Sequence, residues 1–550
     1  MLTNSYHILR IYSIKIILIL CSLCWQSYAQ NTVGVITNTA EAYNGYTLFT
    51  NHTTTYLINN CGEVINQWEC EYIDGKSVYL LEDGSILRCG FVENSNFSLP
   101  GIGGVIQKID WDGTVLWEYT YSSEDYSQHH DVYPLPNGNV LILAVTKKTD
   151  SEAFQAGRDP LLLEENSLYN EQIIEVAPVG FDSGEIVWEW SAWDHLIQDF
   201  DSSKDNFGVV SEHPELLDIN YLGVSIRASN WLHVNSIQYN ETLDQIILSS
   251  RQLNEVYIID HSTTTLEAAG HTGGLYGKGG DFLYRWGNPI AYGHGEEEDQ
   301  QLFGQHTPHW IPEGLVDEGK ILIYNNGNGR PELFSSVDII EPFVDEFNNY
   351  IYEEGQAYGP EVAEWQYTDT PLTDLFSRIM SSAQRLPNGN TLICDSDSGY
   401  FFEIDADENK VWEYINPQKT SGSILSQGDV PESNLTFRAT KYSPDYGAFE
   451  GKDLTPGLPI ELNPNLENCS ILNIEEEILD EVKLYPNPVK TSLYVETKDK
   501  LDEITIYDYT GKLIFKGYEK VLDFSGYSSG MYTISVKING HILHQKVIKI

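Results

Sequence analysis

The chain has 550 residues and a formal net charge of −49, from 81 acidic against 32 basic residues. Nucleic acids and anionic membrane surfaces are bound through clustered Lys and Arg, so no nucleic acid is expected as a partner. The 35 Tyr, 12 Trp and 44 Gly are typical of an all-β protein.

Residues 1–29 have the layout of a signal peptide. A weakly basic lead with Arg10 and Lys15 precedes an apolar stretch at residues 16–25, and Ser-Tyr-Ala at residues 27–29 supplies a small-residue cleavage site. The apolar stretch is too short to span a membrane, and no later apolar run approaches that length. We therefore expect an exported protein with no transmembrane segment in the mature chain.

Two distant segments are nearly identical: Leu-Pro-Asn-Gly-Asn-Val-Leu-Ile from Leu135 and Leu-Pro-Asn-Gly-Asn-Thr-Leu-Ile from Leu386. Each places an Asn-Gly turn between apolar strand segments, which predicts a β-hairpin. Weaker copies begin at Leu81 and Val316. Trp-Glu pairs recur with them, at Trp68, Trp117, Trp188 and Trp412. Because the pairs recur from unit to unit, they indicate packing between units rather than carbohydrate stacking.

A unit that is used several times predicts a β-propeller. Six units can be drawn, at residues 46–69, 78–119, 130–190, 231–286, 306–367 and 381–414. The first is short, so we expect strands from both chain ends to close the ring, with residues 46–49 completing the last blade. The predicted fold is all-β: a six-bladed β-propeller over residues 30–462, followed by a small C-terminal β-sandwich.

The pattern changes after residue 462. Residues 463–480 are polar and acidic and indicate a linker, and residues 481–550 hold short alternating strands between glycine-containing turns, as in a small β-sandwich. Tyr-Pro-Asn-Pro starts at Tyr485 and Gly-Met-Tyr at Gly530. This block closely resembles the C-terminal sorting domain of type IX secretion. The resemblance implies the type IX machinery as a partner, and an outer cell-surface or extracellular location.

Five cysteines follow the signal peptide, and their spacing is not that of a metal site. Cys61 and Cys70 flank a candidate hairpin and could form a disulfide bond. Cys89 and Cys394 lie in apolar strands and are expected to be buried thiols.

When the units are aligned on their turns, three histidines fall at the same position relative to the turn, which we call the histidine phase. His130 and His306 each lie five residues before the first residue of the turn motif in their unit, and His233 falls at the same phase of its own unit. The innermost strands of propeller blades face the central channel, so residues of equal phase point into one ring. We expect the three histidines to converge there. His195, His213, His261, His271 and His294 lie in predicted loops and are expected to be solvated.

A cation is expected close to this ring. Arg330 follows the His306 hairpin, and Lys76 and Ser381 hold the histidine phase in the second and sixth units. Neutral imidazoles exchange protons near pH 7, and arginine binds a tetrahedral oxyanion through paired donors, so the cluster predicts a pocket for a small anion. The alternative for each single histidine is a structural role. The wide sequence spacing gives a zinc site little support, and no metal or organic cofactor is expected.

Further motifs surround these residues. Gly-Gly-Asp-Phe-Leu-Tyr-Arg-Trp-Gly-Asn-Pro starts at Gly279, Trp-Leu-His-Val-Asn-Ser at Trp231 and Ser-Ala-Gln-Arg-Leu-Pro-Asn-Gly-Asn at Ser382. With Gln-His ending at His306 and the Asn-Gly repeats before Arg330, they resemble the bacterial arylsulfotransferase family over roughly residues 40–450. The resemblance implies a six-bladed propeller that moves a sulfuryl group from one phenol to another without a nucleotide donor.

The resemblance also implies a ping-pong reaction through a sulfohistidine. By motif, His233 and His306 would be supporting histidines and Arg330 the arginine that holds the sulfuryl oxygens. The nucleophilic histidine of the family follows that arginine in the chain, and this sequence has no histidine in the matching region. Either His130, His233 or His306 is the nucleophile, or the sulfuryl passes directly between bound substrates, or the activity is lost.

Two functions are therefore open. The leading hypothesis is an exported enzyme that transfers a sulfuryl group from an aryl sulfate to a phenolic acceptor, with His233, His306, Arg330 and His130 as candidate catalytic residues. The alternative is a non-catalytic propeller that binds a sulfated ligand or a partner protein at the cell surface. The intact His-His-Arg set favours the enzyme, and the missing late histidine favours the alternative.

Overall fold

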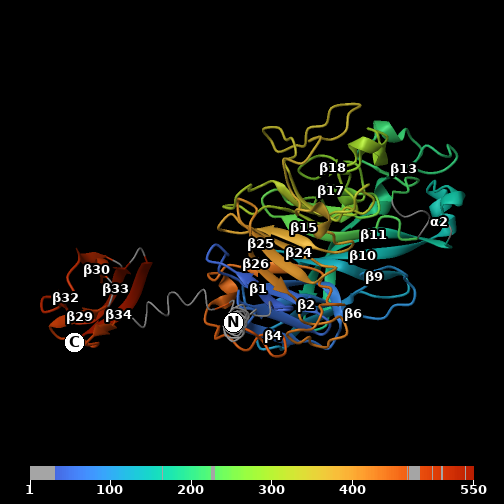
Figure 1. The fold of residues 1–550 in the computed structure, drawn as a ribbon. Coiled ribbons are helices and arrows are strands. Elements are labelled where there is room, and N and C mark those ends of the chain that lie inside the picture. Colours follow the sequence, from blue (N-terminus) through green and yellow to red (C-terminus); the bar gives the residue numbers. More distant parts are fainter. Residues whose placement is uncertain are drawn as a thin grey trace, which may run out of the picture. The chain divides into compact units, whose positions relative to one another are not determined.

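The computed structural model describes residues 31–163, 165–223, 229–466, 469, 483–497, 500–508, 512–538 and 541–550. The predicted signal peptide and most of the predicted linker lie outside the described residues. The chain divides into two compact units after Asn465 (Figure 1). The regular secondary structure of both is almost all β-strand, as the composition predicts. Within the described ranges, no helix has the length and apolarity that crossing a bilayer requires.

The described part of the first unit holds six antiparallel sheets of four or five strands. Three of them are β5 (Asp74–Leu80), β6 (Ile86–Phe91), β7 (Gly104–Ile109) and β8 (Val115–Thr120); β9 (Tyr126–Pro134), β10 (Val140–Thr149), β11 (Ser167–Val179) and β12 (Ser183–Ser191); and β15 (Val234–Asn240), β16 (Gln245–Ser250), β17 (Glu255–Asp260) and β18 (Tyr284–Trp286). The other three are β19 (His306–Trp310), β20 (Ile321–Asn325), β21 (Ser336–Ile340) and β22 (Trp365–Tyr367); β23 (Ser382–Arg385), β24 (Thr391–Asp395), β25 (Tyr400–Ile404), β26 (Lys410–Ile415) and β1 (Gly34–Asn38); and β27 (Ala439–Tyr442), β2 (Tyr46–Asn51), β3 (Thr54–Ile58) and β4 (Val64–Glu69).

The first unit also contains a two-stranded sheet and short helices. A parallel pair is formed by β13 (Leu196–Ile197) and β14 (Leu217–Asp218). Two short helices, α2 (Asp150–Gln155) and α3 (Thr265–Ala268), each begin at a threonine whose hydroxyl accepts a hydrogen bond from the third helical residue. These caps satisfy amide groups that a helix start otherwise leaves unpaired.

Both predicted Asn-Gly hairpins are confirmed. The turn between β9 and β10 closes with hydrogen bonds of 2.9 Å between Leu135 and Asn139 and between Gly138 and Leu135, and the turn between β23 and β24 repeats this pattern. Gly138 has φ 87°, a left-handed conformation that glycine adopts without a steric penalty.

Strands from the two ends of the first unit join sheets whose other strands come from distant parts of the sequence. These strands are not the ones that the sequence predicted. Residues 46–49 lie in β2, which pairs with β3 through a two-residue turn and therefore stays in the first sheet. It is β1 that extends the last sheet, where Val35 lies opposite Tyr414 and Figure 1 shows β1 beside β26. At the other end of this unit, β27 pairs with β2 and completes the first sheet.

Successive sheets contact one another in chain order. The strand at one edge of each sheet contacts the equivalent strand of the next, from β5 to β9, β15, β19, β23 and β27, and β2 contacts β5. The apolar cores lie between neighbouring sheets; one joins Leu87 and Cys89 of β6 to Ile142 of β10. The core of the first unit is therefore divided into layers that separate consecutive sheets.

Tryptophan indoles also tie each sheet to a neighbour, which confirms the packing role predicted for the Trp-Glu repeats. The indole NH groups donate hydrogen bonds of 2.7–3.1 Å, from Trp68 to the Asp110 carbonyl, Trp117 to the Ser183 carbonyl, Trp188 to the Thr263 hydroxyl, Trp286 to the Pro360 carbonyl and Trp412 to the Asn60 carbonyl. The last of these bonds joins the last sheet to the first. A buried indole NH needs such a partner, so the repeated tryptophan fixes the distance between sheets.

The cysteines differ in part from prediction. Cys70 is a free thiol and Cys61 is disulfide-bonded, so the predicted Cys61–Cys70 bond is wrong. Cys469 is disulfide-bonded as well. Cys89 and Cys394 are buried free thiols, as predicted.

The second unit contains two small sheets. They consist of β28 (Lys483–Tyr485), β29 (Ser492–Glu496) and β32 (Val521–Asp523), and of β31 (Leu513–Gly517), β30 (Leu501–Tyr507), β33 (Gly530–Ile538) and β34 (His541–Lys549). Leu493 and Phe524 pack with Ile504 and Ile534 in one apolar core. The two sheets thus share a core as in a sandwich.

Candidate active site

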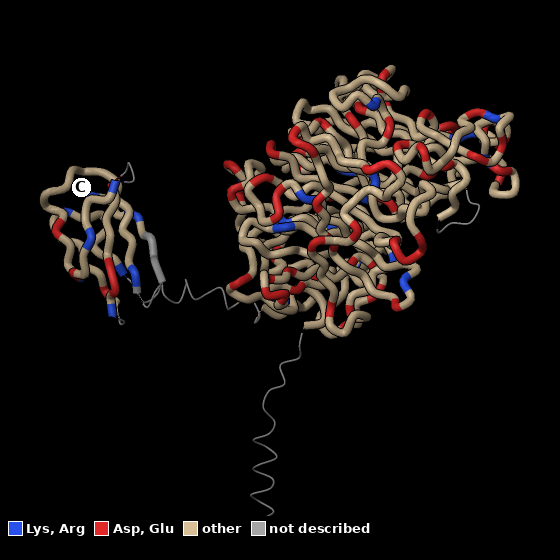
Figure 2. Tube along the Cα trace, turned by 90° about the horizontal axis from the view of Figure 1, so that it is seen from above, with Lys and Arg blue, Asp and Glu red and all other residues tan. Residues whose placement is uncertain are grey.

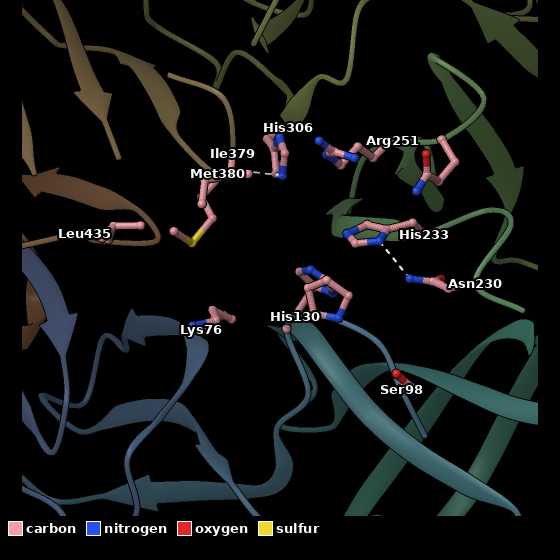
Figure 3. A pocket seen from close by; sticks show the side chains of 13 residues that line it. Lys76, Ser98, His130, Asn230, His233, Arg251, His306, Ile379, Met380 and Leu435 are labelled. Atoms are coloured by element: carbon pink, nitrogen blue, oxygen red, sulfur yellow. Dashed lines mark hydrogen bonds between the residues drawn. The ribbon is translucent and has the colours of Figure 1, made fainter. Parts of the chain in front are cut away.

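The three histidines predicted to converge lie around one cavity of about 550 Å³ in the first unit (Figure 3). His130 comes from β9, His233 directly precedes β15 and His306 begins β19. The cavity is lined by Lys76, Ser98, Pro100, Gly101, His130, Asn230, His233, Arg251, Gln252, His306, Ile379, Met380 and Leu435.

Irregular backbone turns these side chains toward the cavity. The pairing of β9 with β10 is interrupted between Gln128 and Val132, and β5, β15 and β19 are interrupted at the corresponding places. His130 and His233 have φ 52° and 47° and Lys76 has φ 102°, a region that side-chain-bearing residues rarely adopt. Bulges of this kind redirect side chains and occur next to functional sites.

In the last repeat, the residue at the cavity differs from prediction. Ser381 holds the histidine phase in the sequence, but its hydroxyl donates to Ser377 Oγ over 2.8 Å and it is not a lining residue. Met380, one position earlier, lines the cavity instead.

Both ring nitrogens of His306 are occupied. Nδ1 lies 2.7 Å from Asn326 Oδ1, and Nε2 accepts from the Met380 amide over 3.1 Å. The Asn326 amide is held in this orientation because its Nδ2 donates to the Ser377 and Met380 carbonyls. Burial, together with the charge of Arg251, lowers the pKa of His306 to about 3. His306 is therefore a neutral imidazole with its proton on Nδ1.

His233 is held by one partner. Its Nδ1 accepts from Asn230 Nδ2 over 2.8 Å, so the ring proton of the neutral form is on Nε2 (Figure 3). Burial and the nearby Arg251 guanidinium hold the pKa of His233 well below its ordinary value. The ring packs edge-on against His130, with a centroid distance of 4.9 Å.

His130 is the end of a buried chain of three side chains. Its Nδ1 lies 2.8 Å from His129 Nδ1, and His129 Nε2 lies 2.9 Å from Glu171 Oε2. The other carboxylate oxygen of Glu171 accepts from the Val234 amide over 2.9 Å. Burial and then the His233 ring hold the pKa of His130 well below its ordinary value, so the imidazole is neutral. Sequence reasoning missed Glu171, which is brought here by the third strand of the repeat.

The positive charge at the cavity comes from Arg251 and from Lys76, whose Nζ lies 3.5 Å from Asp74 Oδ2. Burial lowers the pKa of Arg251, and within the described ranges no carboxylate forms an ion pair with it. No carboxylate lies among the lining residues, although Figure 2 shows Asp and Glu along much of the first unit. The cavity is thus a cationic region in a strongly acidic protein.

Arg330, the predicted arginine, is not among the lining residues. Its guanidinium donates to the Phe334 carbonyl and to Ser336 Oγ, both over 2.9 Å, and lies 4.2 Å from the Phe334 ring centroid. The sequence signal for Arg251 was weak, because it follows the second strand of a repeat rather than the motif around the histidines.

A group with metal-ligand geometry lies elsewhere. In the described part of the chain, His195, His271 and Asp281 bring three ligand atoms within 4.8 Å of one another. Both His195 nitrogens are already hydrogen-bonded, to Asp281 and to the Ala268 carbonyl. His195 is fully buried and His261 lies between two carboxylates, so the prediction that these two are solvated is wrong.

We expect acid to destabilise the first unit through its buried histidines. The pKa of His309, which donates from Nδ1 to the Thr307 carbonyl, is lowered to about 4 by burial. Below an unfolded pKa of about 6.5 the unfolded chain binds the proton first, so stability is lost as pH falls from about 6.5 to 4. His309 alone would contribute on the order of 3 kcal/mol to this loss. Urea unfolding at several pH values should show a shallower loss in His309→Gln, and an unchanged slope would contradict the assignment.

The fold and the cavity define an all-β protein with a histidine-lined, cationic site. Residues 32–438 match the model of the family described as Arylsulfotransferase (ASST), and the chain belongs to that family. Residues 483–550 match the Secretion system C-terminal sorting domain.

One curated relative is the arylsulfate sulfotransferase AssT of Lelliottia amnigena, 25% identical over 382 residues. The match covers 64% of this chain and 58% of that relative. Among solved structures, a protein of unknown function from Bacteroides caccae has a TM-score of 0.38 at 12% identity, covering 72% of this chain and 98% of that one. A streptogramin B lyase has a TM-score of 0.33 at 11% identity, covering 76% and 95%.

Proposed function

We propose that this chain is an exported enzyme that transfers a sulfuryl group from an aryl sulfate to a phenol, with no nucleotide donor. The observation that carries the proposal is the cavity, in which three neutral histidines and Arg251 meet without a lining carboxylate. Arginine and imidazole NH groups bind sulfate oxygens, and a neutral imidazole can act as a nucleophile or proton acceptor.

The rest of the cavity suits an aromatic ring. Ile379, Met380 and Leu435 form an apolar wall opposite Arg251 and His233 in Figure 3. The volume of about 550 Å³ is within the range of small-molecule sites, which combine apolar walls with a few placed polar groups. An aryl sulfate would place its charged end by Arg251 and its ring by the apolar wall.

The architecture that supports this site is a six-bladed propeller over residues 30–462. The six sheets, their contacts in chain order and the Trp412 bond from the last sheet to the first support this closed ring. Residues 481–550 would act as the type IX sorting domain, which places the enzyme at the outer cell surface or in the medium.

The test is turnover by the purified chain with p-nitrophenyl sulfate and a phenol acceptor, without added nucleotide. We expect release of p-nitrophenol that depends on the acceptor, formation of the acceptor sulfate by mass spectrometry, and loss of both in His233→Ala and His306→Ala. Folding of each variant is checked by its thermal midpoint.

A second function is favoured by one observation: Met380 and Ser381 stand at the histidine phase of the last repeat. A non-catalytic propeller would bind sulfated phenols, or display the cavity to a partner protein, without turnover. Binding by calorimetry with no product over a broad donor panel would support this function and contradict the enzyme.

Replacement of Arg251 should weaken substrate binding. Loss of a charge-assisted contact costs about 1.5–3 kcal/mol, so Arg251→Met is expected to raise KM for the aryl sulfate about 10- to 100-fold. Arg330→Met is the comparison, because the Arg330 guanidinium bonds Phe334 and Ser336 instead. If KM rises in Arg330→Met and not in Arg251→Met, the motif-based assignment of Arg330 is correct and the role of Arg251 is contradicted.

A further inference from the structure

Hydrogen bonds leave one histidine with a free lone pair at the cavity. His306 uses both nitrogens, because Nδ1 donates to Asn326 and Nε2 accepts from Met380. With the Asn230 amide in its present orientation, which leaves its own buried Oδ1 unpaired, His233 accepts at Nδ1, and its Nε2 carries the proton and has no lone pair to give. Neither ring, as bonded, can attack a sulfur atom.

His130 has the opposite arrangement. A carboxylate only accepts hydrogen bonds, so Glu171 fixes a proton on His129 Nε2. In the arrangement in which both rings are neutral, His129 therefore accepts at Nδ1 from His130 Nδ1–H, over 2.8 Å. The second nitrogen of His130, Nε2, keeps its lone pair, and within the described residues it has no hydrogen-bond partner.

We propose that His130 Nε2 is the nucleophile that takes the sulfuryl group, and that His129 and Glu171 form a proton relay behind it. This inference rests on the proposed sulfotransferase function. It replaces the late histidine of the family with a residue from the third repeat unit of the chain.

The step is balanced without a further reactant. The Nε2 lone pair forms the N–S bond while the O–S bond of the aryl sulfate breaks, and its electron pair leaves on the phenolate, which water protonates. The Nδ1 proton of His130 moves to His129, whose positive charge Glu171 neutralises. The acceptor phenol then attacks sulfur, its proton passes to water, the N–S bond breaks, and the Nδ1 proton returns to His130.

The relay explains why the nucleophile is His130 rather than His233, whose ring packs against it. Sulfurylation makes an imidazole acidic, so a group that accepts its Nδ1 proton stabilises the intermediate. Behind His130 stand an imidazole and a carboxylate that are 0% and 2% exposed, where a charge-assisted pair is stronger than in water. Behind His233 stands the Asn230 amide, which cannot accept a proton. His233 Nε2–H is instead a donor to the sulfuryl or phenolate oxygen.

Covalent labelling tests the nucleophile. The full chain is mixed with radiosulfur-labelled p-nitrophenyl sulfate without acceptor, quenched in base, digested and mapped by mass spectrometry. We expect label on the peptide that contains His130, a p-nitrophenol burst equal to the enzyme concentration, and neither in His130→Gln. Imidazole should restore p-nitrophenol release to His130→Gly.

Glu171→Gln tests the relay. The amide would donate to His129 Nε2, His129 Nδ1–H would donate to His130 Nδ1, and the proton of His130 would move to Nε2. The labelling rate should fall about 10³- to 10⁴-fold, as for a carboxylate-to-amide change behind a catalytic histidine, with little change in Kd for the aryl sulfate. Glu175→Gln is the matched control, since Glu175 is also in β11 and bonds His261 away from the cavity.

The outcomes separate this inference from the proposed function. Label on His233 or His306, or a labelled His130→Gln, overturns the inference while transfer stands. Transfer that requires both substrates at once and gives no label also overturns it, in favour of direct transfer. Equal rate losses in Glu171→Gln and Glu175→Gln overturn the relay. Absence of transfer by the unaltered chain overturns the proposed function and the inference together.

Discussion

Gly101→Ala is expected to lower kcat/KM for sulfuryl transfer by more than about 10²-fold, although it alters no titratable group. A Cβ at Gly101 would lie 2.3 Å from both Nε2 and Cε1 of His130, far inside contact distance. The His130 ring cannot move freely, because His129 holds its Nδ1 and His233 packs against its face. A Cβ this close to three ring atoms overlaps the ring itself, so a methyl group at position 101 displaces His130 from its position.

The control for this change is Gly113→Ala. Gly101 has φ 77° and Gly113 has φ 85°, so alanine meets similar backbone strain at both positions, but nothing lies within 4 Å of a Cβ at Gly113. Gly113→Ala should lose thermal stability through backbone strain alone and keep its activity, whereas the clash with His130 should cost Gly101→Ala further stability. Equal activity in the two variants would show that the space beside His130 is not needed. The measurement is initial rate against aryl sulfate concentration for each variant.

Arg438→Met is expected to destabilise the first unit by about 3–5 kcal/mol. The Arg438 guanidinium donates to Asp131 Oδ2 over 2.9 Å and to the Tyr79 hydroxyl over 2.7 Å, and the side chains of Arg438 and Asp131 are 9% and 0% exposed. Removal of the arginine leaves a buried carboxylate without its counter-charge, which costs more than the intact pair contributes. Urea unfolding followed by tryptophan fluorescence measures the loss.

Two further variants make this prediction specific. Asp131→Asn combined with Arg438→Met should recover part of the loss, because no charge is then left unpaired. Arg378→Met removes an arginine whose side chain is 65% exposed and pairs with Asp397, and it should shift the unfolding midpoint little, since exposed pairs contribute little. Similar midpoints for Arg438→Met and Arg378→Met would mean that the Asp131 pair does not stabilise the sheet contacts.

The repeats made the main features of the site predictable. The Asn-Gly turns set a common phase for the repeats, and that phase was enough to bring His130, His233 and His306 to one cavity. This prediction succeeded because a hairpin turn fixes the register of the preceding strand, and the register determines which residues lie at the end of that strand. In the last repeat the predicted position was wrong by one residue, because Met380 lines the cavity instead of Ser381. Both residues have a positive φ just before β23 begins.

Other parts of the site depend on contacts that no repeat encodes. Glu171 reaches His129 from a strand two positions across the sheet, and Arg251 extends from the far side of a hairpin. Arg330 lies in a sequence motif that predicts a site residue, but its guanidinium donates hydrogen bonds to Phe334 and Ser336. Such choices depend on three-dimensional burial and available acceptors, which a single sequence does not show.

The position of β27 also determines when this site can exist during synthesis. Leu435, just before that strand, lines the cavity, and Arg438 reaches Asp131 beside His130. The edge of the first sheet therefore stays open until almost all of the first unit has left the ribosome. A nascent or truncated chain ending before residue 435 would carry every cavity histidine and still lack Leu435 and the Arg438–Asp131 ion pair, so the cavity is completed only with the last part of this unit.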